Sequence, residues 1–279
     1  AERDRIEPVR GRSADRCLAT LRAWFDWHER RARHTAPRQR RSQASAGAAA
    51  RDILTAAIGH EKSRPLSEAD SKRILACYGI RTPREIVARD PDAAITAAEQ
   101  IGGPVALKIV SPDIPHKTEA GGVRLGLSQP ADIRAAAQEV LAFASRYAPR
   151  ARLEGVSVQE MIRSGVEIVL GVKNDRQFGP LVAVGLGGIM VELLGDTAVR
   201  LAPVSAATAR EMLAFLKGYP LLTGFRGKPG VDIDGVVDAI CRLSELAHDL
   251  ADVVDQIDVN PVIASGTGVM AADALIICR

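Results

Sequence analysis

The chain has 279 residues, of which 47% are hydrophobic and 25% charged, and its formal net charge is +3. This composition is ordinary for a globular protein, and the length allows a large core and two compact units. Residues 1–41 hold 12 basic and 6 acidic residues, so the rest of the chain carries a net charge of −3. The basic excess therefore belongs to the N-terminal segment, and we expect no nucleic-acid partner. The sequence has no run of about 18 uncharged apolar residues, so we also expect no membrane span.

Cysteine usage and the N-terminus indicate the compartment. The four cysteines are scattered and form no CxxC motif (Cys17, Cys77, Cys241 and Cys278). Free, buried thiols in a cytoplasmic protein are the ordinary interpretation of such a pattern. The N-terminus is polar and rich in arginine, unlike a secretory signal. We therefore expect a cytoplasmic protein.

The first 50 residues are predicted to form one helix and a basic, flexible linker. Leu18, Leu21, Trp24 and Phe25 recur at helical spacing within residues 14–33. Residues 34–50 contain almost no large apolar side chain, which is typical of a linker. A single amphipathic helix cannot bury its own apolar face, so we interpret it as the last helix of an upstream domain or as a docking helix. The chain begins with Ala1, and a processed or excised piece of a longer polypeptide is one interpretation.

Residues 51–279 alternate between predicted helices and strands, and short turns join many of the strands. This mixture favours the α+β class over a doubly wound sheet. A start similar to a capping box, Ser67–Asp70, precedes the first of these helices. Helices are predicted over 71–78, 91–101, 131–147, 208–216 and 235–252. Strands are predicted over 86–88, 105–110, 122–127, 155–161, 167–173, 181–185, 199–202, 256–263 and 268–277.

The apolar strand at 105–110 carries one lysine, Lys108, and a loop follows with His116 and the pair Gly121-Gly122. A lysine is unfavourable in a buried strand unless an anion neutralises it. Paired glycines let a backbone approach a bulky charged ligand closely, and a loop histidine can serve as base, ligand or nucleophile. The combination predicts a phosphate-handling site. The alternatives are a lysine at a strand edge that reaches water and a solvated histidine.

A second group of polar residues lies near the C-terminus. Asp258 and Asn260 point to the same face of a predicted strand, and Asp273 lies on the next strand across a glycine turn. Hard oxygen ligands of this kind suit Mg²⁺, which completes its shell with phosphates and water. A turn at Asn260-Pro261 and a cap at Asp273 are the alternatives.

Other candidates are weaker when taken one at a time. Glu160 and Glu167 lie on flanking strands, and simple alternation could expose both. The pair Gly187-Gly188 and the segment 223–228 fit either phosphate contact or ordinary turns. The sequence contains neither a GxxxxGK[ST] loop nor a GxGxxG motif that opens a helix. A nucleotide site in this chain must therefore use another architecture.

Taken together and in order, these segments resemble a known family over about residues 60–279. The chain is similar to the ATP-grasp, β-subunit-like part of ADP-forming (NDP-forming) acyl-CoA synthetases, such as acetate–CoA ligase, in the succinyl-CoA synthetase superfamily. The matching segments are Ala106–Lys108, His116–Gly122, Gln159–Met161, Gly165–Glu167, Phe178–Pro180, Gly187–Glu192, Asp258–Pro261 and Ala272-Asp273.

The resemblance implies an ATP-grasp fold of two α+β lobes over 51–279, with a small lobe inserted near 80–160 and a larger lobe over 160–279. It also implies roles for the matching residues. Lys108 would contact the nucleotide phosphates, with Gly121, Gly122, Gly187 and Gly188 as further nucleotide contacts. Glu160 and Met161 would belong to a hinge strand facing the adenine, and Glu167 would lie beside the nucleotide. Asn260 and Asp273 would bind Mg²⁺, Asp258 would steady a phosphohistidine, and His116 would be a second phosphate carrier.

The activity that the resemblance implies is carboxylate + CoA + ATP = acyl-CoA + ADP + phosphate, with a phosphohistidine as an intermediate. The CoA-binding and ligase domains of the family are not in this chain, and residues 14–33 resemble the last helix of those domains. The chain alone is therefore expected to bind ATP or ADP with Mg²⁺ without completing the reaction. Its expected partners are the α-type domains that use CoA, a small carboxylic acid and further copies in an oligomer. The alternatives are a nucleotide-sensing module of a fused acetyltransferase and another ATP-grasp carboxylate ligase. The sequence decides neither the acid nor ATP over GTP.

Overall fold

The computed structural model describes residues 21–22, 24–25, 40–58, 65–111, 113–114, 121–162, 164–188 and 195–279. The chain divides into two compact units, residues 1–39 and 40–279. In the first unit the described residues are helical, and the rings of Trp24 and Phe25 meet edge to face with centroids 5.1 Å apart. The rest of the helix predicted over 14–33 lies outside the described residues.

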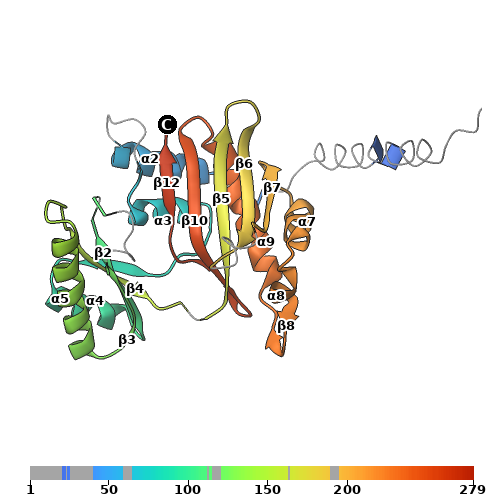
Figure 1. The fold of residues 1–279 in the computed structure, drawn as a ribbon. Coiled ribbons are helices and arrows are strands. Elements are labelled where there is room, and N and C mark those ends of the chain that lie inside the picture. Colours follow the sequence, from blue (N-terminus) through green and yellow to red (C-terminus); the bar gives the residue numbers. More distant parts are fainter. Residues whose placement is uncertain are drawn as a thin grey trace, which may run out of the picture. The chain divides into compact units, whose positions relative to one another are not determined.

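The second unit has two lobes, each with its own hydrophobic core (Figure 1). The small lobe comprises β1 (Glu85–Ala88), α4 (Pro91–Ile101), β2 (Val105–Val110), β3 (Val123–Leu127), α5 (Pro130–Tyr147) and β4 (Gly155–Glu160). The large lobe comprises α2 (Ala46–Ile58), α3 (Glu68–Cys77), β5 (Val166–Asp175), β6 (Gly179–Leu186), β7 (Thr197–Leu201), α7 (Ala206–Phe215), α8 (Tyr219–Thr223), β8 (Gly224–Phe225), β9 (Lys228–Pro229), α9 (Ile233–Asp249), β10 (Val254–Ser265), β11 (Gly268–Ala271) and β12 (Leu275–Cys278).

The small lobe is a four-stranded antiparallel sheet in the order β1-β4-β2-β3, with α4 and α5 packed against it. Its helices bury mostly alanine, because small side chains let a helix lie close to a sheet. In α5 the buried positions recur at helical spacing, which is why the sequence pattern predicts this helix (Ile133, Ala136, Ala137, Val140 and Ala144). Figure 1 shows α4 and α5 side by side, away from the large lobe.

The large lobe is built on an antiparallel sheet in the order β11-β10-β5-β6-β7, with β12 also paired to β10. Helix α9 packs across β5 and β6 and buries one apolar stripe, which includes Val236, Ile240 and Leu243. Helix α3 contacts β12, and the backbone amide of Leu66 donates to Ile276 O at 2.9 Å. The core of the large lobe therefore contains segments that precede the small lobe as well as segments that follow it, so the prediction that the larger lobe spans only 160–279 is wrong. The predicted α+β class is confirmed, since every sheet is antiparallel.

Two further predicted boundaries are wrong. The linker predicted over 34–50 ends earlier, because α2 begins at Ala46 and buries Ala46, Ala50 and Leu54. Alanine is the best helix former, and these residues are spaced by one helical turn, although they lack the large apolar side chains that the prediction sought. The strand predicted over 268–277 is two strands, and Asp273 lies in the break between β11 and β12.

Candidate functional site

Lys108 joins the two lobes. It lies on β2, inside the small-lobe sheet between β4 and β3, so the alternative of a strand-edge lysine is wrong. Its Nζ donates to Glu68 Oε1 at 3.0 Å and to the carbonyl oxygen of Ala272 at 3.2 Å. The same atom lies 3.7 Å from Asp273 Oδ2. A cation of the small lobe therefore meets the large lobe at the break between β11 and β12.

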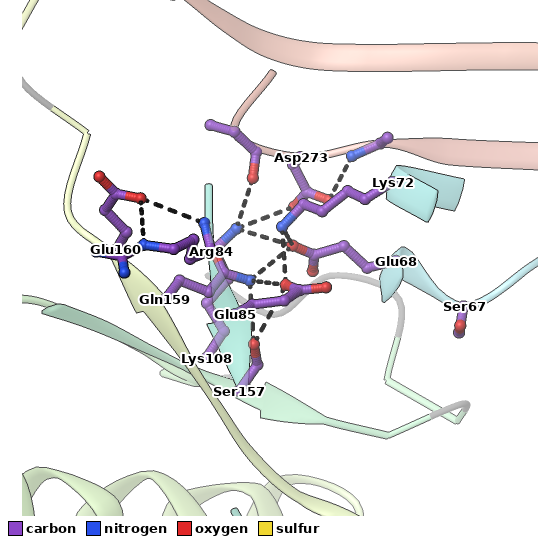
Figure 2. A network of polar contacts seen from close by, with 12 residues as sticks. Ser67, Glu68, Lys72, Arg84, Glu85, Lys108, Ser157, Gln159, Glu160 and Asp273 are labelled. Atoms are coloured by element: carbon purple, nitrogen blue, oxygen red, sulfur yellow. Dashed lines mark hydrogen bonds and ion pairs between the residues drawn. The ribbon is translucent and has the colours of Figure 1, made fainter. Parts of the chain in front are cut away.

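A polar network surrounds Lys108, and Figure 2 shows its members converging from both lobes. Lys72 on α3 is only 2% exposed, and its Nζ lies 2.5 Å from Glu68 Oε1 and 3.2 Å from Glu85 Oε2. Gln159 on β4 donates to Glu68 Oε1 at 3.1 Å and to Glu85 Oε2 at 2.8 Å. A buried ammonium is stable only when carboxylates compensate its charge, and this network supplies two.

The predicted metal ligands lie on neighbouring segments of the large-lobe sheet. The amide of Ala272 donates to Pro261 O at 2.9 Å, which makes the positions of Asp273 and Asn260 neighbours. Burial, and then the charge of Asp273, raise the pKa of Asp258 above its ordinary value. The negative charge of Asp273 therefore adds to the cost of ionising Asp258. A divalent cation would relieve this cost, and an amide oxygen from exposed Asn260 suits Mg²⁺.

The structure brings Glu167 together with Gly187 and Gly188. The amide of Gly187 donates to Glu167 O at 2.6 Å, and a β-carbon added to Gly187 would lie 2.7 Å from Glu167 Cβ. Gly188 has a φ of +66°, which favours glycine. These glycines are therefore required by close packing and backbone conformation at this point of the chain. Their contact with phosphate stays a prediction.

Glu160 and Met161 lie where the chain leaves the small lobe. Glu160 ends β4, and its Oε2 accepts from the backbone amide and the Nε of Arg84, each at 3.4 Å. The amide of Met161 donates to Pro104 O at 3.1 Å. Both residues precede the crossing to β5, and their role in a hinge strand that faces the adenine stays a prediction. Figure 2 shows Glu160 beside Arg84 at the edge of the network.

The predicted phosphate loop is described only in part. His116 and its neighbours 115–120 lie outside the described residues. Gly121 has a φ of +58°, and a β-carbon there would lie 2.8 Å from the ring of Phe143. Gly122 accepts a hydrogen bond from the Ile109 amide at 2.8 Å, so the end of the loop is attached next to Lys108.

A family model for the ATP-grasp domain matches residues 57–278. This chain belongs to the ATP-grasp family. The match includes the small lobe, most of the large lobe and every predicted site residue, among them Lys108, Asp258 and Asp273. In the part of the chain that the structure describes, no helix is long and apolar enough to cross a bilayer.

Relatives place the chain within the ATP-grasp family. It is 41% identical over 230 residues to the β subunit of acetate–CoA ligase [ADP-forming] I of Pyrococcus furiosus, covering 82% of this chain and 98% of that protein. It is 37% identical over 211 residues to the 4-hydroxybutyrate–CoA ligase [ADP-forming] of Nitrosopumilus maritimus, covering 76% of this chain but 30% of that protein. The chain is thus a homologue of ADP-forming acyl-CoA ligase β subunits.

A solved structure shares this ATP-grasp architecture at 39% identity. It is an acetyl-coenzyme A synthetase of Ca. Korarchaeum cryptofilum in complex with coenzyme A and Ca-AMPCP, with a TM-score of 0.79, covering 82% of this chain and 100% of that one. Another structure of the same enzyme, at 37% identity and a TM-score of 0.72, holds coenzyme A and Mg-AMPPCP with a phosphohistidine segment pointing towards the nucleotide-binding site. It covers 82% of this chain and 100% of that chain.

Sequence reasoning gave no site role to Glu68, Lys72 or Glu85, and it included Gln159 only as part of the matching segment Gln159–Met161. Glu68 was interpreted only within a helix start, and that start is real: Ser67 caps α3 by accepting from the Asp70 amide at 3.1 Å. A signal was present in the pair Glu68 and Lys72, which lie one helical turn apart on a short helix. It did not show that the pair faces the other lobe.

Proposed function

We propose that this chain is the nucleotide-binding, phosphoryl-transfer subunit of an ADP-forming acyl-CoA ligase. The proposed reaction is carboxylate + CoA + ATP = acyl-CoA + ADP + phosphate. The observation that carries the proposal is the 3.7 Å approach of Lys108 Nζ, on one lobe, to Asp273 Oδ2, on the other. A phosphate group bound there would meet a fixed cation and a carboxylate suited to Mg²⁺.

The chemistry of the residues fits phosphoryl transfer. Such a reaction is catalysed mainly by positioning and by charge stabilisation of the transferred group. Lys108 supplies one positive charge, and Asn260 and Asp273 would hold Mg²⁺, which would offset further negative charge on the phosphates. Asp258 would orient a phosphohistidine, and His116, outside the described residues, would accept and pass on the phosphoryl group.

The proposed partner is an α-type subunit or domain that binds CoA and the acid. The relative from Pyrococcus furiosus is named as a β subunit, and the longer relative from Nitrosopumilus maritimus is more than three times the matched length. We therefore expect ligase activity only when this chain is combined with such a partner. We also propose a cytoplasmic location, where ATP and CoA would both be available to such a reaction.

The test is calorimetric binding of ADP with Mg²⁺ to the 279-residue chain and to Lys108→Met. Loss of a charge-assisted contact of roughly 1.5–3 kcal/mol should weaken binding by about 10- to 150-fold. The control is Lys173→Met, which removes an exposed lysine of β5 paired with Asp255 at 2.6 Å. It should bind as tightly as the wild type. Equal affinity in wild type and Lys108→Met would refute the assignment of Lys108.

A further inference from the structure

Glu68 receives three donors on one oxygen atom, from both lobes. Its Oε1 lies 2.5 Å from Lys72 Nζ, 3.0 Å from Lys108 Nζ and 3.1 Å from Gln159 Nε2. Lys72 is on the same large-lobe helix, α3, whereas Lys108 and Gln159 are on small-lobe strands. The side chain of Glu68 is only 11% exposed. This carboxylate is therefore a buried link across the seam between the lobes.

The two lysines of the network have different surroundings. Lys72 lies between two carboxylates, those of Glu68 and Glu85, and its side chain is 3% exposed. Its ammonium is enclosed by protein, so it is not placed to meet a ligand. Lys108 also has two carboxylates near its Nζ, but its side chain is 13% exposed and that of Asp273 beside it is 37% exposed. Of the two, Lys108 is the lysine that faces the predicted phosphate and metal position.

We propose that Glu68 is a positioning residue that holds Lys108 Nζ beside Asp273 in the place where a nucleoside diphosphate needs it. This inference rests on the proposed function. A lysine side chain loses rotamer freedom when a ligand fixes it, and a contact that fixes it in advance removes this cost from binding. Glu68 fixes Lys108 through the ion pair, and Ala272 O holds the same ammonium from the large lobe.

The same contacts argue that Glu68 stays in place when a phosphate arrives. Its Oε1 is also bonded to Lys72 and Gln159, and Gln159 is itself tied to Glu85. To leave Lys108, the carboxylate would have to abandon buried donors, and an unpaired buried charge is costly. Glu68 is therefore a support for the lysine and not a competitor of the phosphate.

The test is a double-mutant cycle of Glu68→Gln and Lys108→Met, read by calorimetric binding of ADP with Mg²⁺ to the full chain. Gln keeps the shape of the side chain and removes the charge. We expect Glu68→Gln to weaken binding about tenfold, a coupling typical of residues in one network. In the Lys108→Met background the same change should have no further effect. The control is Glu139→Gln, an exposed glutamate of α5 that pairs with Arg124 at 3.2 Å.

The outcomes separate the role of Glu68 from a general loss of structure and from failure of the nucleotide site. Equal weakening in both backgrounds would show that Glu68 acts without Lys108 and would overturn the proposal. Unchanged or tighter binding in Glu68→Gln would overturn it as well, the latter by making Glu68 a competitor. If wild type and Glu139→Gln bind no nucleotide, the proposed function fails and this inference fails with it.

A second variant keeps the test decisive if Glu68→Gln does not fold. Glu68→Asp keeps the charge but withdraws the carboxylate by one methylene. It should also weaken ADP binding when Lys108 is present and leave binding unchanged in the Lys108→Met background. The melting temperature of each variant measures any loss of stability separately from this effect on binding. If Glu68→Asp binds ADP as tightly as the wild type, Glu68 does not position Lys108 and the proposal is overturned.

Discussion

Gly187 and Glu167 approach each other so closely that no side chain fits between them. The Gly187 amide donates to the Glu167 carbonyl at 2.6 Å, and a β-carbon on Gly187 would lie 2.7 Å from Glu167 Cβ and 3.0 Å from its carbonyl carbon. Real β-carbons essentially never come so close to a heavy atom, so the backbone would have to shift. Glu167 is the residue predicted to lie beside the nucleotide. A substitution that disturbs this contact therefore tests whether nucleotide binding depends on the position of Glu167.

Gly187→Ala should therefore weaken binding of ADP with Mg²⁺ and lower the melting temperature. Forcing a methyl group into packed backbone costs roughly 1–3 kcal/mol. The matched control is Gly171→Ala on β5, where an added β-carbon would meet Ala183 at an ordinary 3.8 Å. That variant should keep its affinity. Equal affinity in Gly187→Ala and wild type would show that Glu167 does not depend on this contact.

The predicted metal ligands imply that ADP binding depends on Mg²⁺. Asp273 and Asn260 lie at neighbouring positions because the backbone amide of Ala272 donates a hydrogen bond to Pro261 O. Removal of Mg²⁺ by a chelator should weaken ADP binding to the wild type by about tenfold or more, because one ligand contact to a charged group contributes roughly 1.5–3 kcal/mol. In Asp273→Asn that difference should largely disappear, and calorimetry with and without Mg²⁺ measures it.

The control for the metal prediction is Asp255→Asn, which removes another carboxylate from β10. Asp255 pairs with Lys173 on the surface at 2.6 Å. The Asp255→Asn variant should show the same difference in ADP affinity with and without Mg²⁺ as the wild type. An Asp273→Asn variant that responds to Mg²⁺ as the wild type does would place the cation elsewhere.

Local patterns explain which parts of the fold and site could be predicted. Helix α5 repeats its buried residues every three or four positions, and β2 is a short apolar run, so both are visible in the sequence. Asp258, Asn260 and Asp273 could be grouped because a short turn connects β10 to β11, and Asp273 closely follows β11. Helix α2 was not predicted, because its buried face is largely alanine and the prediction relied on large apolar residues.

The network around Glu68 could not be predicted by the same means. Glu68 and Lys108 are 40 positions apart, and Glu68 and Gln159 are 91 positions apart. Their contact depends on how the small lobe folds back against α3, and no local period records that. The resemblance to a family supplied roles for Lys108 and Asp273, but it assigned none to the residues that hold them in place.

Two aspartates of α9 predict a loss of stability in acid. Burial opposes ionisation of Asp249, but hydrogen bonds from Arg40 and Tyr78 hold its pKa below the ordinary value. Asp238 is likewise opposed by burial, and Arg242 and Arg41 lower its pKa. In the unfolded chain both carboxylates take up protons first as the pH falls. Their contribution to the free energy of unfolding is therefore complete above the unfolded pKa of about 3.9 and is lost as the pH falls through the folded values.

Arg40→Met should lower the urea midpoint at pH 7 and bring it closer to that of the wild type at about pH 3, where Asp249 is increasingly protonated. Urea midpoints between these two pH values measure the effect. The comparison variant is Arg134→Met, which removes an arginine paired with Asp92 at 2.6 Å, with side chains 49% and 76% exposed. Exposed pairs contribute little, so its curve should follow the wild type. A constant offset for Arg40→Met at every pH would contradict the role of the ion pair.

Glu245 anchors the start of the second unit, and its removal should free that segment. The carboxylate is 8% exposed and accepts from the amides of Arg41 at 2.7 Å and Ser42 at 2.8 Å, as well as from the Ser42 hydroxyl. Glu245→Ala leaves these donors without their acceptor, which costs roughly 1–3 kcal/mol per unsatisfied buried group. We expect the melting temperature to fall by about 2–4 °C for each kcal/mol lost.

The same variant should also become sensitive to trypsin after Arg41, since a protease needs an extended, unbonded backbone. Mass spectrometry of a brief digest would report cleavage between Arg41 and Ser42 in Glu245→Ala and much less in the wild type. Glu139→Ala, which removes an exposed glutamate of α5, is the control and should digest as the wild type does. If Glu245→Ala melts earlier but the Arg41–Ser42 bond is cut no faster, the carboxylate stabilises α9 without holding the segment that precedes α2.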